Sequence, residues 1–199
     1  MKWSATKFDR EQLLAFIQAI DRNLPEETSV VLVGGSAAII GYGSPVRTSD
    51  VDVFVGLTDG FVEAGLEAQK ETGLAIGIEQ SALTDIPYNY EDRVRAVKIP
   101  RLKRLTVIVP DKYDLVLSKT IRGYPHDLEA IEGIHKQHPL VLKTLVERFE
   151  TELVGIVNSN PRILRQNVVA VVAALFGVSE ARKLAESWGL PTPSTKSKK

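Results

Sequence analysis

The run from Val30 to Val55 reads VVLVGGSAAIIGYGSPVRTSDVDVFV, and the organisation of the whole chain follows from it. Two apolar, β-branched runs of the kind that form strands flank a Gly-Gly-Ser turn and a short apolar segment. The second run carries carboxylates at Asp50 and Asp52, and residues two apart on a strand point to the same face. The stretch therefore predicts a strand, a short helix and a second strand that projects a pair of carboxylates.

Composition excludes several classes of protein. The 199 residues are 44% hydrophobic and 25% charged, which is ordinary globular usage, and 25 basic residues balance 25 acidic ones. Zero net charge argues against binding of nucleic acid through a large basic surface. The lack of cysteine excludes disulfides, thiolate nucleophiles and Cys-based zinc sites. The start, MKWSATKFDREQ, lacks the apolar core of a signal peptide, and no apolar run approaches the roughly 18 residues of a membrane span. We expect a cytoplasmic protein.

Hydrophobic periodicity places the regular elements along the chain. In the first half it predicts helices over 8–23, 36–40 and 61–72, and strands over 28–33, 49–55, 74–79, 93–99 and 104–109. Strands that first alternate with helices and then follow one another as a hairpin predict an α/β (α+β) fold, a mixed sheet flanked by helices.

The second half of the chain has a helical pattern. It predicts helices over 113–121, 127–135, 139–158 and 161–188, the last with a break at Gly177, and a proline falls at or just before each start. The end, PTPSTKSKK, has nothing to bury and is expected to be disordered. The predicted organisation is a sheet-containing core over 1–110, a helical C-terminal region over 111–190 and a disordered tail over 191–199.

The Gly-Gly-Ser turn and the acidic strand suit complementary parts of one ligand. Gly34, Gly35 and Ser36 lie where a strand gives way to a helix, and free N–H groups at a helix start attract anions such as phosphate. Paired carboxylates offer the oxygen ligands of Mg²⁺, which usually keeps water and substrate phosphates as its other ligands. Singly, these motifs also fit an ordinary turn and a solvated strand end, but their order and spacing favour nucleoside triphosphate chemistry.

The same motifs resemble those of a known group. Gly34-Gly35-Ser36, followed by RTSDVDV at 47–53, resembles the signature of the polymerase-beta-like nucleotidyltransferase superfamily. The segment YDLVLSK at 113–119, with Arg122 and HDL at 126–128, is similar to the helices of the AbiEii-type toxin branch, whose members are abortive-infection and toxin-antitoxin toxins.

This resemblance implies a Mg²⁺-dependent transfer of a nucleoside monophosphate from a nucleoside triphosphate. It implies catalytic roles for Asp50, Asp52 and Lys119, with the two aspartates as metal ligands. Nucleotide-binding roles fall to Gly34, Gly35, Ser36, Arg47 and Thr48. The implied partners are the nucleoside triphosphate, an antitoxin protein and an RNA acceptor, with no membrane. The residues themselves leave the acceptor open among RNA, a protein side chain and a small molecule.

One expected feature of that family is absent. Such enzymes usually carry a third carboxylate on a later strand, but the predicted strands over 93–99 and 104–109 contain no acid. Glu79 and Asp92 are the candidates to replace it as metal ligands. The alternative is therefore a catalytically incomplete member of the fold that binds a nucleotide or a partner.

Overall fold

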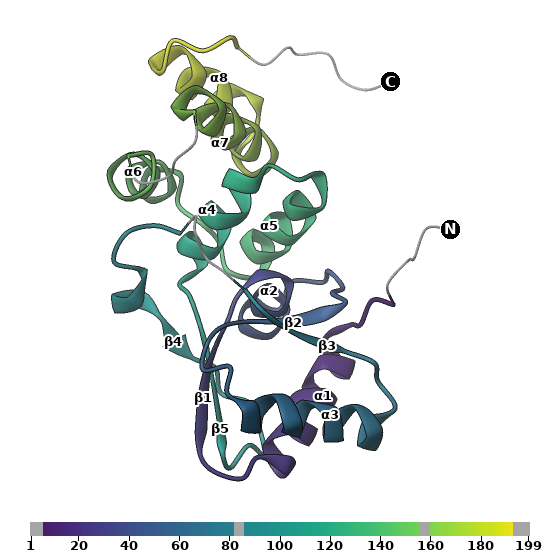
Figure 1. Cartoon of the computed structure of the whole chain (residues 1–199). Coiled ribbons are helices and arrows are strands. Elements are labelled where there is room, and N and C mark those ends of the chain that lie inside the picture. Colours follow the sequence, from purple (N-terminus) through teal and green to yellow (C-terminus); the bar gives the residue numbers. More distant parts are fainter. Residues whose placement is uncertain (1–5, 82–85, 156–159, 193–199) are drawn as a thin grey trace.

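A five-stranded mixed sheet forms the lower half of the molecule (Figure 1). The computed structural model describes residues 6–81, 86–155 and 160–192. The strands are β1 (Thr28–Leu32), β2 (Asp50–Val55), β3 (Gly77–Gln80), β4 (Arg95–Ala96) and β5 (Leu105–Val109). Their spatial order is β3-β2-β1-β5-β4; β1 pairs antiparallel with β2 and parallel with β5. β3 runs parallel to β2, and β4 antiparallel to β5. The predicted mixed sheet with flanking helices is confirmed.

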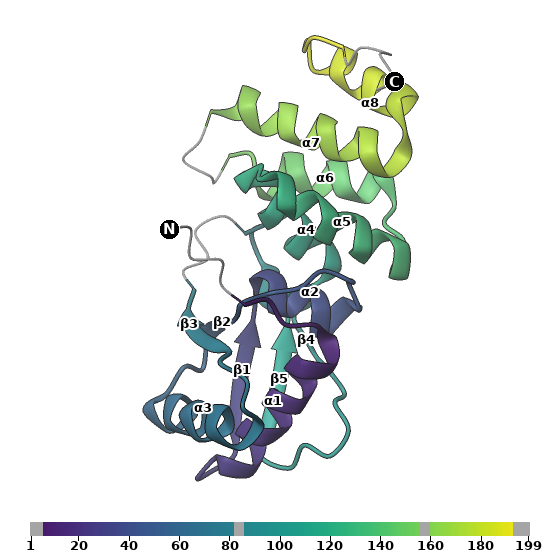
Figure 2. The ribbon, with the colours of Figure 1, turned by 90° about the vertical axis from the view of Figure 1, so that its right-hand side faces the viewer.

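Two helices lie side by side against one face of this sheet (Figure 2). They are α1 (Arg10–Asn23) and α3 (Asp59–Thr72), and each starts at a side-chain cap. The Asp9 side chain accepts a hydrogen bond from the backbone N–H of Gln12, and the backbone N–H of Asp9 donates to the Gln12 side chain. This capping box makes α1 begin at Arg10. The predicted start at Phe8 was therefore too early. Phe8 instead exchanges two backbone hydrogen bonds with Thr48, at 2.7 and 3.1 Å, which ties the N-terminal segment to the loop before β2.

A buried carboxylate fastens α1 to the sheet. Asp21 is 4% exposed and accepts backbone N–H groups from Lys103, Arg104 and Leu105 at 2.7 to 3.1 Å. Burial raises the pKa of Asp21, but these three N–H groups outweigh burial and hold its pKa below the usual value. Asp21 thereby fixes the point at which β5 begins.

The helical region stacks above the sheet (Figure 1). It consists of α4 (Lys112–Arg122), α5 (Pro125–Gln137), α6 (Leu142–Glu152), α7 (Pro161–Phe176) and α8 (Val178–Ser187). The predicted break at Gly177 is confirmed, because Gly177 has φ 92° between α7 and α8. Helix α2 (Gly34–Tyr42) lies between the two halves, where it contacts both α4 and α5.

Several predicted boundaries were wrong. The strand predicted over 93–99 is a 3₁₀ turn, η1 (Tyr90–Arg93), followed by the two-residue β4, because the Arg93 guanidinium turns away to bind Asp114 on α4. The strand predicted over 74–79 begins only at Gly77, and the helix predicted over 139–158 is α6, which ends at Glu152. Residues 156–158 of the helix predicted over 139–158, and most of the predicted disordered tail, lie outside the described residues.

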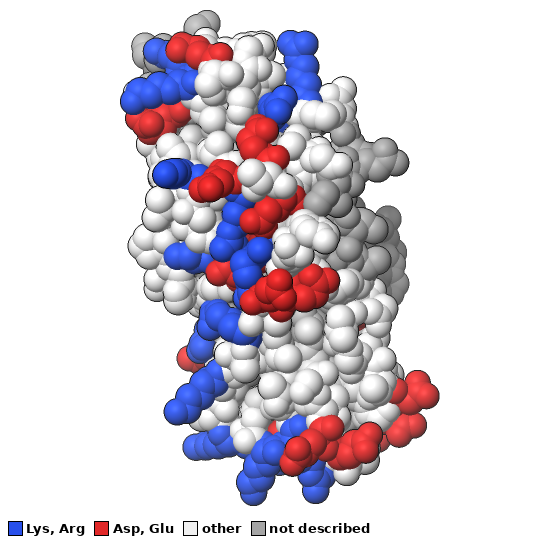
Figure 3. Space-filling model, turned by 90° about the vertical axis from the view of Figure 1, so that its left-hand side faces the viewer, with Lys and Arg blue, Asp and Glu red and all other residues white. Residues whose placement is uncertain are grey.

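Charge is mixed rather than segregated over much of the surface. Figure 3 shows acidic and basic side chains interleaved on one face of the molecule. Several of these residues form ion pairs between elements, such as Arg148 with Asp111 at 2.7 Å and Arg165 with Glu150 at 3.1 Å. No helix in the described ranges combines the length and apolarity needed to cross a membrane.

Candidate functional site

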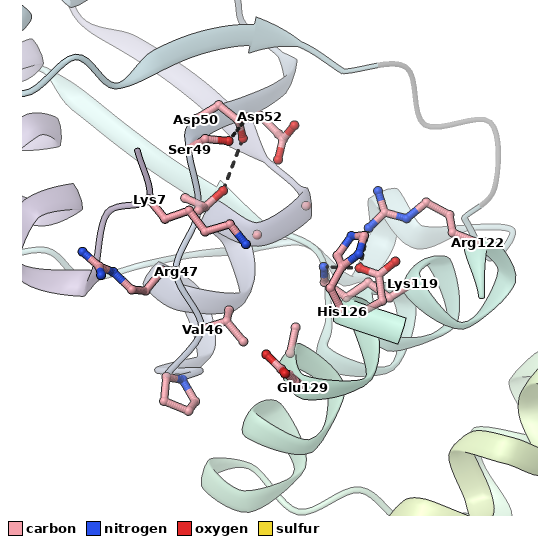
Figure 4. A pocket seen from close by; sticks show the side chains of 16 residues that line it. Lys7, Val46, Arg47, Ser49, Asp50, Asp52, Lys119, Arg122, His126 and Glu129 are labelled. Carbon is pink, nitrogen blue, oxygen red and sulfur yellow. Dashed lines mark hydrogen bonds and ion pairs between the residues drawn. The ribbon is translucent and has the colours of Figure 1, made fainter. Parts of the chain in front are cut away.

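A cavity of about 620 Å³ opens between the sheet and the helical region. One wall comes from the start of α2, the loop before β2 and β2 itself, and the opposite wall comes from α4 and α5 (Figure 4). Its lining comprises Lys7, Gly34, Gly35, Pro45, Val46, Arg47, Thr48, Ser49, Asp50, Asp52, Lys119, Arg122, His126, Asp127, Glu129 and Ala130. The structure thus brings the predicted acidic strand, glycine turn and lysine to one space.

The first wall presents the two predicted carboxylates. Val51 and Val53 are 1% and 0% exposed and anchor β2 in the core, so Asp50 and Asp52 project from the other face into the cavity. Two hydroxyl groups donate hydrogen bonds to the Asp50 carboxylate, Ser49 at 2.8 Å and Thr48 at 3.3 Å. Within the described residues, neither aspartate forms an ion pair with a lysine, arginine or histidine.

The acidic pair carries an uncompensated charge. Burial, and then the neighbouring Asp50 carboxylate, raise the pKa of Asp52 to about 6, and Glu79 adds to this rise. Lys119 and the backbone N–H of Gly35 oppose it only in part. A half-buried carboxylate with a raised pKa and no ion-pair partner favours binding of a cation.

The start of α2 requires glycine because Asp52 lies directly against it. Gly34 has φ +60°, and a Cβ there would lie 2.0 Å from Asp52 Oδ2. A Cβ on Gly35 would lie 2.9 Å from Thr48 Oγ1. The two glycines therefore let the positive end of the helix approach the acidic strand closely.

Ser36, the third residue of the predicted phosphate turn, does not reach the cavity. Its side chain is fully buried, and its hydroxyl donates to the Val33 carbonyl at 2.9 Å. Arg47 and Thr48 do line the cavity, but Thr48 is 8% exposed and the Arg47 guanidinium points away from the centre (Figure 4). Gly34 and Gly35 therefore line the cavity, whereas the hydroxyl of Ser36 does not.

The second wall carries two cations, Lys119 and Arg122, beside two carboxylates, Asp127 and Glu129. Lys119 is 3% exposed and donates to Asp127 Oδ1 at 3.1 Å, and Arg122 donates to the same oxygen at 2.8 Å. His126 lines this wall as well, and Lys7 directs its ammonium group into the space between the walls (Figure 4). A ligand that carries several negative charges would fit between this wall and a metal ion on the acidic wall.

Neither candidate for a third carboxylate completes a ligand cluster. Glu79 is paired in register with Asp52 on the adjacent strand, so the two side chains lie on the same face of the sheet. Asp92 lies in η1 and does not line the cavity. Across residues 6–81, 86–155 and 160–192, no group of three or more histidine or acidic side chains is arranged to hold a metal ion.

Sequence reasoning missed two of the charged residues at the cavity and assigned no role to two others. Lys7 arrives through the pairing of Phe8 with Thr48, and Glu129 through the first turns of α5; neither has a motif to mark it. Arg122 and Asp127 were visible only as parts of a resemblance. Asp127 does leave a signal, because it falls on the buried face of α5 with Ala130, Ile131 and Ile134, where the helical period calls for an apolar residue.

A family model described as "Nucleotidyltransferase of unknown function (DUF6036)" matches residues 11–168. The match begins in α1 and ends in α7, so it includes both walls of the cavity. No curated protein and no solved structure matches the chain.

Proposed function

The chain belongs to the DUF6036 family of nucleotidyltransferases of unknown function, and from this membership we propose that it moves a nucleoside monophosphate from a nucleoside triphosphate to an acceptor with the help of Mg²⁺. One observation carries the proposal. Asp50 and Asp52 project together into a cavity without a cationic partner of their own among the described residues, opposite a wall formed by Lys119 and Arg122. This arrangement suits a metal-bound triphosphate, whose metal and phosphates would meet opposite walls.

The donor set fits magnesium. Asp50 and Asp52 offer carboxylate oxygens on one strand face, and burial together with the Asp50 carboxylate raises the pKa of Asp52 to about 6, an environment that a bound cation would stabilise. When bound, Mg²⁺ supplies charge neutralisation and Lewis-acid chemistry to phosphoryl transfer. Glu79 is the better placed of the two candidates for a further ligand, because it lies in register beside Asp52.

The other residues of the cavity bind and orient the nucleotide. The backbone N–H groups at the start of α2 and the side chain of Lys119 would hold the phosphates. A nucleophilic oxygen of the acceptor forms a bond to the α-phosphorus, its proton leaves to solvent or a nearby base, and the bond to the β-phosphate breaks to release pyrophosphate. The acceptor is RNA, a protein side chain or a small molecule, and the experiment below tests RNA and the side chains of the protein itself.

The test is labelling with each of the four α-³²P nucleoside triphosphates in MgCl₂, with total RNA and the protein itself as acceptors. We expect label from at least one nucleotide, and its loss in the double variant Asp50→Asn/Asp52→Asn. The double variant Glu63→Gln/Glu67→Gln on α3 removes the same charge away from the cavity and should label normally. Equal labelling by the cavity variant would contradict the mechanism.

We propose further that this nucleotide transfer makes the protein a toxin. Expression of the wild type should slow cell growth, whereas expression of the Asp50→Asn/Asp52→Asn variant should leave growth normal, and co-purification would then identify an antitoxin protein. If the wild type and the variant slow growth equally, a toxin role based on this chemistry is refuted.

A second function is favoured by the lack of a three-residue ligand cluster within the described ranges. The chain would then be a module that binds a nucleotide or a partner without transferring the nucleotide. Mg²⁺-dependent nucleotide binding by the wild type, combined with no labelling of any acceptor, would support this function over the first.

A further inference from the structure

Two cations of the second wall share a single carboxylate oxygen. Asp127 is 2% exposed, and both Lys119 and Arg122 donate to its Oδ1 atom, at 3.1 and 2.8 Å. Its Oδ2 atom is buried and has no hydrogen-bond partner among the described residues. Buried carboxylates normally satisfy both oxygens, because a buried acceptor without a hydrogen bond destabilises the folded state.

A carboxylate at the other end of α4 shows the usual arrangement. Asp114 is 0% exposed, and Arg93 engages both of its oxygens, at 2.9 and 3.0 Å. Arg148 donates to it as well, at 3.4 Å. Asp114 thus has the fully satisfied geometry of a structural ion pair. Asp127 does not, although it lines the candidate active site.

We propose that Asp127 is a positioning residue, which holds Lys119 as an ammonium ion in the cavity wall and keeps Arg122 on the same oxygen until a substrate phosphate takes Arg122 away. The proposal rests on the proposed function and adds a division of labour between the two cations. Lys119 is the fixed cation, and Arg122 is the exchangeable one.

Burial separates the two roles. The side chain of Lys119 is 4% exposed, so it has little freedom to leave Asp127, whereas the side chain of Arg122 is 42% exposed. When Arg122 moves onto a phosphate, Lys119 still neutralises Asp127, so no buried charge is left unpaired. Exchange of Lys119 instead would take a buried ammonium from its only ion-pair partner among the described residues.

The electrostatics of Lys119 agree with this division. Burial lowers the pKa of Lys119, and the Asp127 carboxylate is the strongest influence that raises it again. The other charged groups that act on Lys119 are Arg122 from the same helix, which lowers its pKa, and Asp52 from β2, which raises it. Without Asp127, burial would favour the neutral amine.

The test is the affinity of the full chain for inorganic tripolyphosphate in MgCl₂, measured by isothermal titration calorimetry. If the only effect of Asp127 were to repel the anion, Asp127→Asn would tighten the binding of tripolyphosphate. We expect binding to weaken about tenfold, because Lys119 loses both its charge and its orientation. The matched control is Asp114→Asn, which also removes a buried carboxylate of α4–α5 but lies away from the cavity; affinity per folded molecule should not change.

A second variant keeps the test decisive if Asp127→Asn folds poorly. Arg122→Gln changes a partly exposed side chain and leaves the pair of Lys119 with Asp127 intact, and it should weaken tripolyphosphate binding severalfold. Unchanged or tighter binding in Asp127→Asn, unchanged binding in Arg122→Gln, or no binding by the wild type would each overturn the proposal. Normal tripolyphosphate binding without nucleotide transfer would instead refute only the transferase function.

Discussion

Asp52 on β2 and Asp114 on α4 are two carboxylates taken out of water, and the protein treats them in opposite ways. Burial is the largest influence on both and raises the pKa of each. Around Asp114 the chain supplies Arg93 and Arg148. Around Asp52 it supplies another carboxylate, a glycine backbone and a distant lysine. Asp114 on the helical side therefore has two arginine partners, whereas Asp50 and Asp52 on the sheet have no ion-pair partner among the described residues.

The largest effect is expected from removing Asp114, the carboxylate that has arginine partners. Asp114→Asn should destabilise the protein by about 3 kcal/mol or more, because it leaves Arg93 without its main partner. Urea unfolding of both proteins measures the effect. Glu152→Gln, which removes the more exposed partner of Arg93, should cost less than about 1 kcal/mol. A loss at position 114 no larger than this would contradict the structural role.

Removing the unbalanced charge should have the reverse effect. The pKa of Asp52 in the folded state, about 6, exceeds the ordinary 3.8, so the folded state binds the proton more tightly and stability falls as pH rises between these values. At pH 7 and without Mg²⁺, Asp52→Asn should therefore stabilise the protein by about 1–3 kcal/mol. At pH 2.5, where the Asp52 carboxyl is protonated in both the folded and the unfolded state, the gain should vanish. Thermal unfolding at the two pH values checks the sign, and destabilisation at pH 7 would contradict the account.

Because α2 lies close to Asp52, alanine substitution should affect metal binding at one glycine of positive φ and not at another. Gly34→Ala places a Cβ at the Asp52 carboxylate, while Gly73→Ala, at a similar φ of +69°, meets no atom within 4 Å. Both should lose about 1–2 kcal/mol from backbone strain. Only Gly34→Ala should also weaken Mn²⁺ binding, measured by calorimetry. Equal metal affinity in the two variants would show that Asp52 does not serve as a ligand.

The smallest effect concerns the hydroxyl that holds Asp50. Ser49→Ala removes a donor at 2.8 Å and should reduce Mn²⁺ affinity by less than tenfold, or roughly 1 kcal/mol. Ser29→Ala on the exposed side of β1 is the control. Tighter metal binding in Ser49→Ala would mean that the hydroxyl competes with the ion instead of orienting its ligand.

Local patterns were sufficient to predict one wall of the cavity. The period of two along β2 predicts that Asp50 and Asp52 share one face while Val51, Val53 and Val55 share the other. Val51 and Val53 are buried as this pattern requires, whereas Val55, the last residue of the strand, is exposed. The proline at position 161 likewise predicts where α7 starts, since proline is compatible with the first turn, whereas α5 starts at Pro125, two residues before its predicted start.

The rest depends on contacts between distant parts of the chain, which periodicity does not encode. Arg93 leaves its expected strand for Asp114, 21 positions away in the sequence. Lys7 reaches the cavity because Phe8 pairs with Thr48. Ser36 follows two glycines in the predicted phosphate turn. In the first turn of α2, however, its hydroxyl points into the core and donates a hydrogen bond to the Val33 carbonyl.

We propose that Asp50 and Asp52 form a cation site, since neither has an ion-pair partner among the described residues. Mn²⁺ binding followed by electron paramagnetic resonance tests this proposal, because free and bound ions are counted separately. We expect the wild type and the Glu63→Gln/Glu67→Gln control to bind Mn²⁺ alike, with Mg²⁺ as a competitor, and Asp50→Asn/Asp52→Asn to lose this binding. Binding that survives in the Asp50→Asn/Asp52→Asn variant, or that is missing from the wild type, would contradict the claim.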